Sequence, residues 1–256
     1  MVPRRRPRSG DDARPQRVKF PRGHVALERA LSKLGAASRA EAQRLVRAGR
    51  VTVDGAVVTQ PLTAVVPERS TIAIDGVHVR RGGWRTIVFH KPRGVVTTRR
   101  DPEGRKTVFD VLGSAAQGLV AVGRLDLASA GVLLLTTDTR LADWLTDPAN
   151  GVIRRYAVTA RGSVSDDARR QLEAGIDDLR ASRVTVRKRS GRETHLIVEL
   201  DEGKNREIRR LFSAIGHEVT RLTRVAFGAI ELGSLQPGEF RELTREELRR
   251  AFGVGL

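Results

Sequence analysis

The chain has 256 residues, of which 39% are hydrophobic, and a formal net charge of +17. This length and hydrophobic content allow one or two packed domains and exclude a chain that is disordered throughout. The large positive charge disfavours a small neutral substrate as the only partner and favours a polyanion, most simply nucleic acid.

The absence of cysteine and of long apolar runs excludes further kinds of site and of protein. It contains no cysteine, which rules out disulfides, iron–sulfur clusters and thiolate zinc sites. No apolar run approaches the roughly 18 residues that a transmembrane helix needs, and the basic N-terminus has no apolar core of a secretory signal. We therefore expect a cytoplasmic protein with no membrane partner.

The first third of the chain predicts a tail followed by a small folded module. Residues 1–22 are rich in arginine and proline and have no periodic apolar face, which indicates a disordered basic tail. One helix is expected to end at Gly35, and a second begins at the capping box Ser38-Arg39-Ala40-Glu41. A hairpin around Asp54-Gly55 and a strand at 71–74 follow, so that a two-helix plus β domain is predicted over 23–80.

Four arginines belong to the second helix or its end: Arg39, Arg44, Arg47 and Arg50. Arg44 and Arg47 are three residues apart and therefore share a helix face. A solvated helix face is the simpler interpretation. Because acidic residues are scarce on that face, we favour RNA binding by these four arginines.

The stretch LERALSKLGAASRAEAQRLVRAGRVTVDGAVV has the order helix, helix and Val-x-Val-Asp-Gly. In this it resembles the S4 RNA-binding domain, and the resemblance covers about residues 25–79. It implies binding to structured RNA, mainly ribosomal, and a catalytic or ribosomal domain alongside.

A linker is predicted at 81–85 and a second domain over 86–256. Strands are expected at 86–89, 95–100, 119–122, 132–135, 154–159, 184–186 and 195–200, with short ones near 219–232. Helices are expected near 108–112, 141–145, 165–175 and 206–215, and after Thr244. Because helices and strands do not alternate one for one, we expect an α+β domain with a mixed, largely antiparallel sheet and flanking helices.

A polar quartet, Gly123-Arg124-Leu125-Asp126, separates two apolar runs in the middle of this domain. An arginine and a carboxylate are therefore expected on a loop held between two buried strands, where a scaffold can present a reactive group. A structural Arg124–Asp126 pair that closes a turn is an equally good interpretation of the quartet alone.

Two further polar clusters lie at strand ends or helix starts, namely Tyr156 and the run Lys204-Asn205-Arg206 with Arg209. If the fold brings them to Asp126, the arginines would keep that carboxylate ionised and nucleophilic. Tyr156 would offer a ring for stacking and a phenol for proton transfer. Such a site suits chemistry on a flipped-out nucleotide without a metal or redox cofactor.

Three motifs now resemble one family. GRLDLASAGVLLLTTD is similar to the catalytic motif of the RsuA-like ribosomal RNA pseudouridine synthases, KPRGVVTTRRDPEGRKTV to their upstream motif, and EGKNREIRRLFSAIGHEVTRL to their C-terminal motif. With the S4-like module in front, the resemblance spans most of residues 25–247. It implies the isomerisation of uridine to pseudouridine in ribosomal RNA, with no cofactor, because the reaction is redox-neutral.

The resemblance also implies roles for single residues. Asp126 would be the catalytic aspartate, acting at the sugar C1′ or the base C6, and Tyr156 would stack on the target base and serve as a candidate proton acceptor. Arg209 would be the partner of the aspartate, and Arg124 would shape the loop or hold phosphate. The expected substrate-binding residues are Arg124, Tyr156, Lys204, Asn205 and Arg209.

Three positions depart from the family pattern: Glu207 replaces glutamine, Thr139 replaces glycine, and Asp147 replaces the histidine before a proline. None of them is a predicted catalytic position. An inactive relative that binds ribosomal RNA in ribosome assembly stays open as an alternative, as does a metal nuclease that uses Asp126 and Asp138.

The family motifs do not identify the target uridine. We favour 23S over 16S ribosomal RNA, either free or in a pre-ribosomal particle, and expect a monomer.

Overall fold

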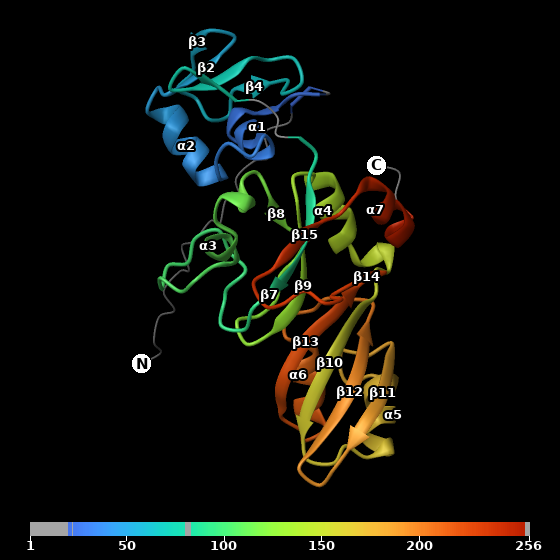
Figure 1. Ribbon diagram of the computed structural model, residues 1–256. Coiled ribbons are helices and arrows are strands. Elements are labelled where there is room, and N and C mark those ends of the chain that lie inside the picture. The colour runs from blue at the N-terminus through green and yellow to red at the C-terminus, as the bar shows by residue number, and fades with distance from the viewer. Residues whose placement is uncertain (1–19, 22, 80–82, 254–256) are drawn as a thin grey trace, which may run out of the picture. The chain divides into compact units, whose positions relative to one another are not determined.

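The computed structural model describes residues 20–21, 23–79 and 83–253 (Figure 1). These separate into two compact units, one with the residues up to Ser32 and Ala37–Val79, the other with Lys33–Ala36 and the chain from residue 83. The predicted tail falls almost entirely outside the described residues, and so does the start of the predicted linker. No helix in the described part of the chain is long and apolar enough to cross a membrane.

The smaller unit contains two helices and two small sheets. The helices are α1 (Leu27–Lys33) and α2 (Arg39–Arg47). One sheet pairs β1 (Val25–Ala26) with β4 (Ala64–Val65), and the other has the order β3 (Ala56–Val57), β2 (Val51–Val53), β5 (Ile72–Ile74) and β6 (Val77–His78). Ser38 caps α2 as expected, and the turn between β2 and β3 has Asp54 and Gly55 at positive φ, as the hairpin signal requires.

The larger unit is built on a nine-stranded sheet. Its main path runs β11 (Arg183–Arg189), β12 (Glu193–Leu200), β10 (Arg154–Arg161), β13 (Val219–Phe227), β9 (Ala130–Thr136), β7 (Thr86–Lys91) and β15 (Phe240–Glu242). In addition, β8 (Val120–Ala121) pairs with β9, and β14 (Ile230–Glu231) pairs with β13. Every pairing is antiparallel except that of β9 with β13, so the sheet is mixed and largely antiparallel, as the sequence predicts.

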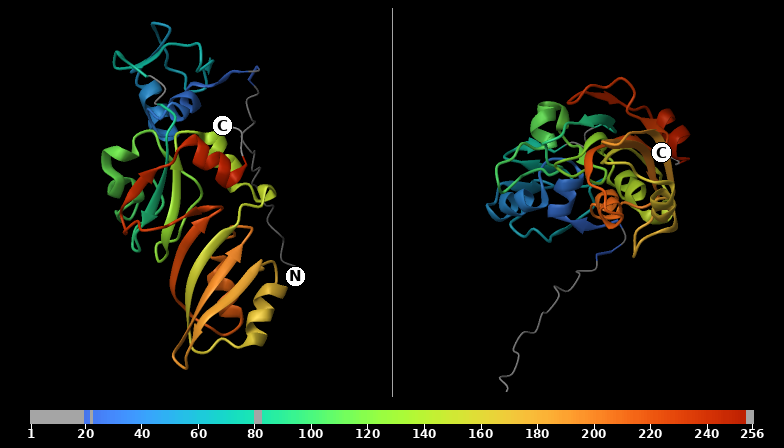
Figure 2. Two further views of the ribbon diagram at one scale, coloured as in Figure 1. Left: turned by 45° about the vertical axis from the view of Figure 1, so that its right-hand side comes forward. Right: turned by 90° about the horizontal axis from the view of Figure 1, so that it is seen from below.

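Helices cover both faces of this sheet. They are α3 (Val108–Leu112), α4 (Thr139–Thr146), α5 (Asp166–Ala174), α6 (Glu207–Ala214) and α7 (Arg245–Phe252), with 3-10 turns at Gly113–Ala116 and Pro148–Asn150. Leu133 and Leu135 of β9 pack in a cluster with α3, α5 and α6, whereas Val132 and Leu134 pack with α4 and α7. Figure 2 shows α5 beside the strands β10 to β12. The aliphatic run after Asp126 is therefore buried on both sides and anchors the sheet.

The predicted strand at 95–100 is wrong. Only Val96 forms an isolated bridge, to Thr107, and the chain bends over residues 97–99. The segment bends instead, and the Thr97 hydroxyl binds the backbone of Leu125. This contact between a side chain and a neighbouring loop replaces the regular backbone pairing of a strand. This local irregularity brings the 92–98 segment against the loop that carries Asp126.

Candidate active site

Asp126 lies on the loop between β8 and β9, and neighbouring segments hold the backbone on both sides of it. Before it, the Thr97 hydroxyl donates to the carbonyl oxygen of Leu125 at 2.9 Å and accepts from its amide at 3.2 Å. After it, the amide of Gly94 donates to the carbonyl oxygen of Leu127 at 2.8 Å. The loop is therefore ordered before any substrate arrives, which removes an ordering cost from each turnover.

Lys91, at the end of β7, lies beneath this loop and is fully buried. Its ammonium group donates to the carbonyl oxygens of Ser129 at 2.8 Å, Pro92 at 3.0 Å and Asp126 at 3.1 Å, which uses all three donors. Burial lowers the pKa of Lys91 to about 8, although the Asp126 carboxylate opposes the shift. The sequence analysis did not predict a role for Lys91. The one signal was its position, because it is a lysine at the end of a strand that contains no other Lys, Arg, Asp or Glu.

A cavity of about 660 Å³ opens in front of Asp126. Segments far apart in the sequence line it, and they include five of the six residues predicted for the site: Arg124, Asp126, Tyr156, Lys204 and Asn205. Arg209 does not line this cavity and instead borders a smaller one next to α6. The tertiary structure thus brings residues of all three predicted polar clusters to one cavity, whereas Arg209 lies outside its lining.

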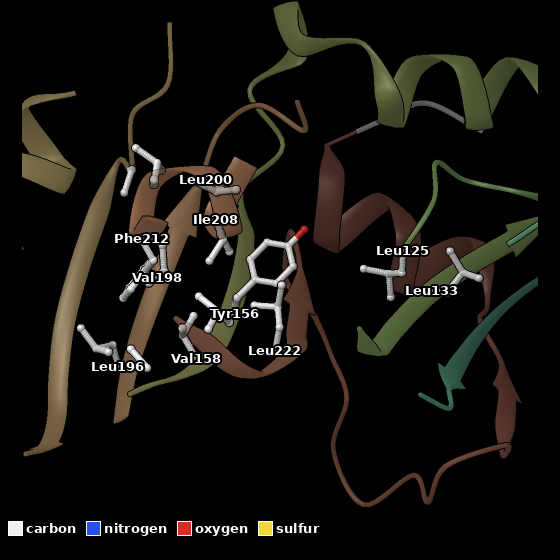
Figure 3. Packing of buried hydrophobic residues seen from close by; sticks show 14 of the residues in the cluster. Leu125, Leu133, Tyr156, Val158, Leu196, Val198, Leu200, Ile208, Phe212 and Leu222 are labelled. Carbon is white, nitrogen blue, oxygen red and sulfur yellow. The ribbon is translucent and has the colours of Figure 1, made fainter. Parts of the chain in front are cut away.

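Tyr156 projects from β10 into this cavity and is 9% exposed. In Figure 3 its ring packs near Val158, Ile208 and Leu222, and its hydroxyl points away from the aliphatic cluster. The hydroxyl makes no hydrogen bond with any residue that the structure describes. The apolar packing fixes the ring, so the phenol is presented to a ligand.

The Asp126 carboxylate has no hydrogen bond or ion pair within the described part of the chain. Arg209 donates instead to the carbonyl oxygens of Val219 at 2.8 Å and Ala128 at 3.4 Å. Burial lowers the pKa of Arg209, while the negative charge of Asp126 opposes that shift. Arg209 therefore contacts the backbone of the Asp126 loop and interacts electrostatically with the carboxylate, without a direct hydrogen bond or ion pair to it.

The alternative of a structural Arg124–Asp126 pair is not realised. Arg124 is exposed and forms no ion pair with a described residue. It belongs to the lining of the cavity and is exposed to solvent.

Two buried arginines that sequence reasoning did not assign also line the cavity. Arg154 on β10 and Arg224 on β13 lie over the Phe227 ring, 5.2 and 5.0 Å from its centroid. Arg154 donates to the carbonyl oxygens of Asp201 at 2.8 Å and Leu145 at 3.3 Å. The signal that could have found them is strand alternation, because both occupy inward positions of strands whose other inward residues are mostly apolar.

Glu207, the first residue of α6, is a buried carboxyl in the same wall. It accepts a hydrogen bond from the backbone amide of Lys204 at 3.0 Å, and burial raises its pKa. The Lys204 ammonium lies 2.9 Å from Glu202 at the mouth of the cavity. The departure from the family pattern at Glu207 thus places a buried carboxyl in the cavity lining, where it also binds the backbone of the loop before α6.

The other two departures are local, and one of them bears on the metal hypothesis. Thr139 begins α4, and Asp147 caps the following 3-10 turn by accepting from the amide of Ala149. Asp138 caps α4 by accepting from the amides of Arg140 and Leu141. Asp138, the second carboxylate of the metal nuclease hypothesis, is therefore engaged in capping α4. No group of three His, Asp or Glu residues in the described ranges is arranged to hold a metal.

The four arginines predicted to bind RNA in the smaller unit are exposed, but two of them are engaged with carboxylates. Arg44 pairs with Glu41, and Arg50 binds Asp75 with Nε 2.8 Å from Oδ1. The latter contact raises the pKa of Arg50 and lowers that of Asp75. The face thus carries more acid than the sequence suggested. The other two predicted RNA-binding residues, Arg39 and Arg47, form no ion pair with a residue in the described ranges.

Comparison with known proteins gives the family. The model of the RNA pseudouridylate synthase family matches residues 85–214, and that of the S4 domain matches residues 27–68. The chain is 34% identical over 232 residues to "Ribosomal large subunit pseudouridine synthase B" of Bacillus subtilis (strain 168), covering 88% of this chain and 94% of the relative. It is 34% identical over 238 residues to an "Uncharacterized RNA pseudouridine synthase" of Aquifex aeolicus (strain VF5), covering 91% and 96%.

A solved structure agrees with the fold. The crystal structure of a pseudouridylate synthase superposes with a TM-score of 0.61 at 23% identity and covers 89% of this chain and 99% of that one. With the sheet order, the cavity around Asp126 and the two family matches, the chain belongs to the RNA pseudouridine synthases of the RsuA type, with an S4 domain in front of the catalytic domain.

Proposed function

We propose that this enzyme converts a specific uridine to pseudouridine in ribosomal RNA, and that the uridine belongs to the 23S molecule. Relatives at 34% and 40% identity are named large-subunit pseudouridine synthases, which supports the choice of RNA. The observation that carries the reaction is the free Asp126 carboxylate, on a loop held by Lys91 and Thr97, in the same cavity as Tyr156.

The proposed chemistry needs no net oxidant or reductant. The bond between C1′ and N1 of uridine breaks, a bond between C1′ and C5 forms, C5 loses a proton and N1 gains one. Asp126 supplies the nucleophile at C1′ or C6, because an ionised carboxylate without a protein partner is free to attack. Tyr156 stacks on the base and faces the proton at C5.

The remaining site residues bind the substrate in this proposal. Arg124, Lys204 and Asn205 contact the nucleotide from the rim, and Arg209 orients the loop of the aspartate. The S4 domain, which we place at residues 23–80, holds structured RNA through Arg39, Arg44, Arg47 and Arg50, and a linker at 81–85 leads to the catalytic domain at 86–256. Monomeric state, cytoplasmic location and action on a pre-ribosomal particle stay predictions.

The test maps pseudouridine in 23S and 16S RNA from cells that lack the gene and are complemented with wild type, Asp126→Asn or Asp143→Asn. Asp143 is an exposed carboxylate on α4 and serves as the control. We expect one 23S site that is present with wild type and Asp143→Asn and absent with Asp126→Asn. A site in 16S RNA would correct the target. Modification that persists with Asp126→Asn, while only ribosome assembly changes, would favour the inactive RNA-binding alternative.

A further inference from the structure

Positive charge is concentrated in and beneath the inner wall of the Asp126 cavity. Lys91, Arg154 and Arg224 are 0%, 5% and 4% exposed, and none of them forms an ion pair with a described residue. Two carboxyl groups that line the cavity are similarly buried. Asp101, whose side chain is 5% exposed, is paired with Arg105, and burial raises the pKa of Glu207, which favours its neutral form. A buried positive charge without a direct ion-pair partner is costly, so this wall suits a ligand that carries or develops negative charge.

Of the three cations, Arg224 alone has a fully buried nitrogen without an acceptor. The donors of Lys91 and the terminal nitrogens of Arg154 meet backbone carbonyl oxygens. Arg224 donates through Nε to the carbonyl oxygen of Val132 at 2.7 Å, but its buried Nη2 has no acceptor. Buried nitrogens without a partner also occur in Trp84 and Arg209, yet neither residue lines this cavity. Because Arg224 lines the cavity, a bound ligand is the nearest source of an acceptor for this unsatisfied guanidinium nitrogen.

The position of Arg224 is coupled to that of the catalytic loop. Its backbone pairs with Gly131 in the parallel contact of β13 with β9, five residues after Asp126. A Cβ at Gly131 would collide with the carbonyl oxygen of Arg224, so only glycine permits this approach of the two strands. The guanidinium and the carboxylate are therefore carried by adjoining, tightly paired segments.

We propose that the Nη2–H of Arg224 donates to a carbonyl oxygen of the target uracil and stabilises the negative charge that develops on the ring. This inference rests on the proposed uridine isomerisation. A flat base taken out of its stack can reach a side chain that is 4% exposed, whereas backbone phosphates are met at the rim by exposed arginines such as Arg124.

The chemistry places negative charge where Arg224 can meet it. If Asp126 adds to C6, the electron pair of the C5–C6 bond moves toward the C4 carbonyl and charges O4. If Asp126 attacks C1′, the C1′–N1 pair stays on the ring and spreads over N1, O2 and O4. O4 gains charge in both cases, and the Arg224 proton stays on the guanidinium. A fixed donor aimed at developing charge stabilises the transition state more than the bound substrate.

The experiment uses the full-length protein and a synthetic ribosomal RNA fragment that contains the uridine mapped above. Single-turnover rates and Kd are measured for wild type, Arg224→Lys and Arg154→Lys. Arg154 is the matched control, because it is equally buried over the same Phe227 ring but has its terminal nitrogens occupied. We expect Arg224→Lys to slow the reaction by about tenfold to a hundredfold and to change Kd by less than about threefold.

The decisive measurement repeats these rates with 4-thiouridine and with 2-thiouridine at the target, since sulfur is a poorer hydrogen-bond acceptor. The effect of 4-thio substitution on wild type should largely disappear in Arg224→Lys and persist in Arg154→Lys, as two groups in contact are not additive. Coupling to 2-thio substitution instead would also support the contact and would place it at O2. Equal thio effects in all three proteins would overturn it.

Failure of the proposed function and failure of the Arg224 contact give different results. If wild type forms no pseudouridine in any ribosomal RNA, the proposed function fails and this inference fails with it. If wild type is active but shows no coupling with Arg224, only the inference fails. Should Arg224→Lys not fold, as judged by circular dichroism, Arg224→Gln replaces it, because a glutamine amide can still donate to Val132.

Discussion

The arginines in and just after α2 and the buried cations in and beneath the wall of the cavity carry the same charge in opposite environments. The side chains of Arg44 and Arg50 are 67% and 53% exposed and meet carboxylates at the surface. Lys91, Arg154 and Arg224 are nearly inaccessible and meet backbone carbonyl oxygens. In water, a charge acts over about 8 Å at physiological salt and adds to affinity for any RNA. In the interior, a charge is directional and acts on one chemical group. A buried cation is therefore suited to catalysis, and an exposed cation is suited to RNA binding.

The largest effect that this comparison predicts is on catalysis. Lys91→Met should lower the single-turnover rate by at least about a hundredfold, because three carbonyl oxygens around the Asp126 loop lose their donor and the carboxylate moves. The Kd for RNA should change by less than about twofold, since Lys91 is out of reach of the substrate backbone. Single-turnover and binding measurements on a target fragment check this.

The matched control for this prediction is Lys106→Met, which removes an exposed lysine of the same domain. If the two variants have the same rate, burial of Lys91 has no catalytic consequence and the comparison fails.

A second prediction concerns stability and pH. The pKa of Lys91 is about 8 in the folded protein, compared with an ordinary value of 10.5. Between these two pH values, Lys91 is mostly protonated in the unfolded chain and mostly deprotonated in the folded protein. Stability therefore rises with pH from about 8 to 10.5, by about 3 kcal/mol in the unfolding free energy relative to Lys91→Met. Urea unfolding followed by tryptophan fluorescence measures it, because Trp84 and Trp144 both belong to the larger unit. A difference that stays flat across the window would contradict the shift.

The smallest effect is expected at the surface. Arg47→Ala should weaken RNA binding a few-fold and reduce the slope of log K against log salt by about 1, because Arg47 has no ion pair with a described residue. The rate at saturating RNA should not change. Filter binding between about 50 and 200 mM salt tests this, with the exposed Arg69→Ala of the same unit as the control. An unchanged slope would mean that the α2 face does not meet RNA.

Sequence alone determined the features that depend on local periodicity and capping. The helices at α1 and α2 follow from an apolar stripe and from Ser38, and the buried strand β9 follows from the run Val132–Leu135. The polar quartet between two apolar runs predicted the loop that carries Asp126, whereas the catalytic role proposed for Asp126 came from the resemblance of its motif to the family. These signals are readable because each arises within a few residues of the chain.

Tertiary structure decided what depends on contacts between distant segments. The strand predicted at 95–100 is absent because Thr97 binds Leu125, and the partner expected for Asp126 is displaced because Arg209 binds the carbonyl oxygens of Ala128 and Val219. The parallel pairing of β9 with β13 places Arg224 in the cavity of Asp126, although almost a hundred positions separate them. A charged residue in a strand predicts a surface position unless its neighbours in space are known, and only the folded chain supplies them.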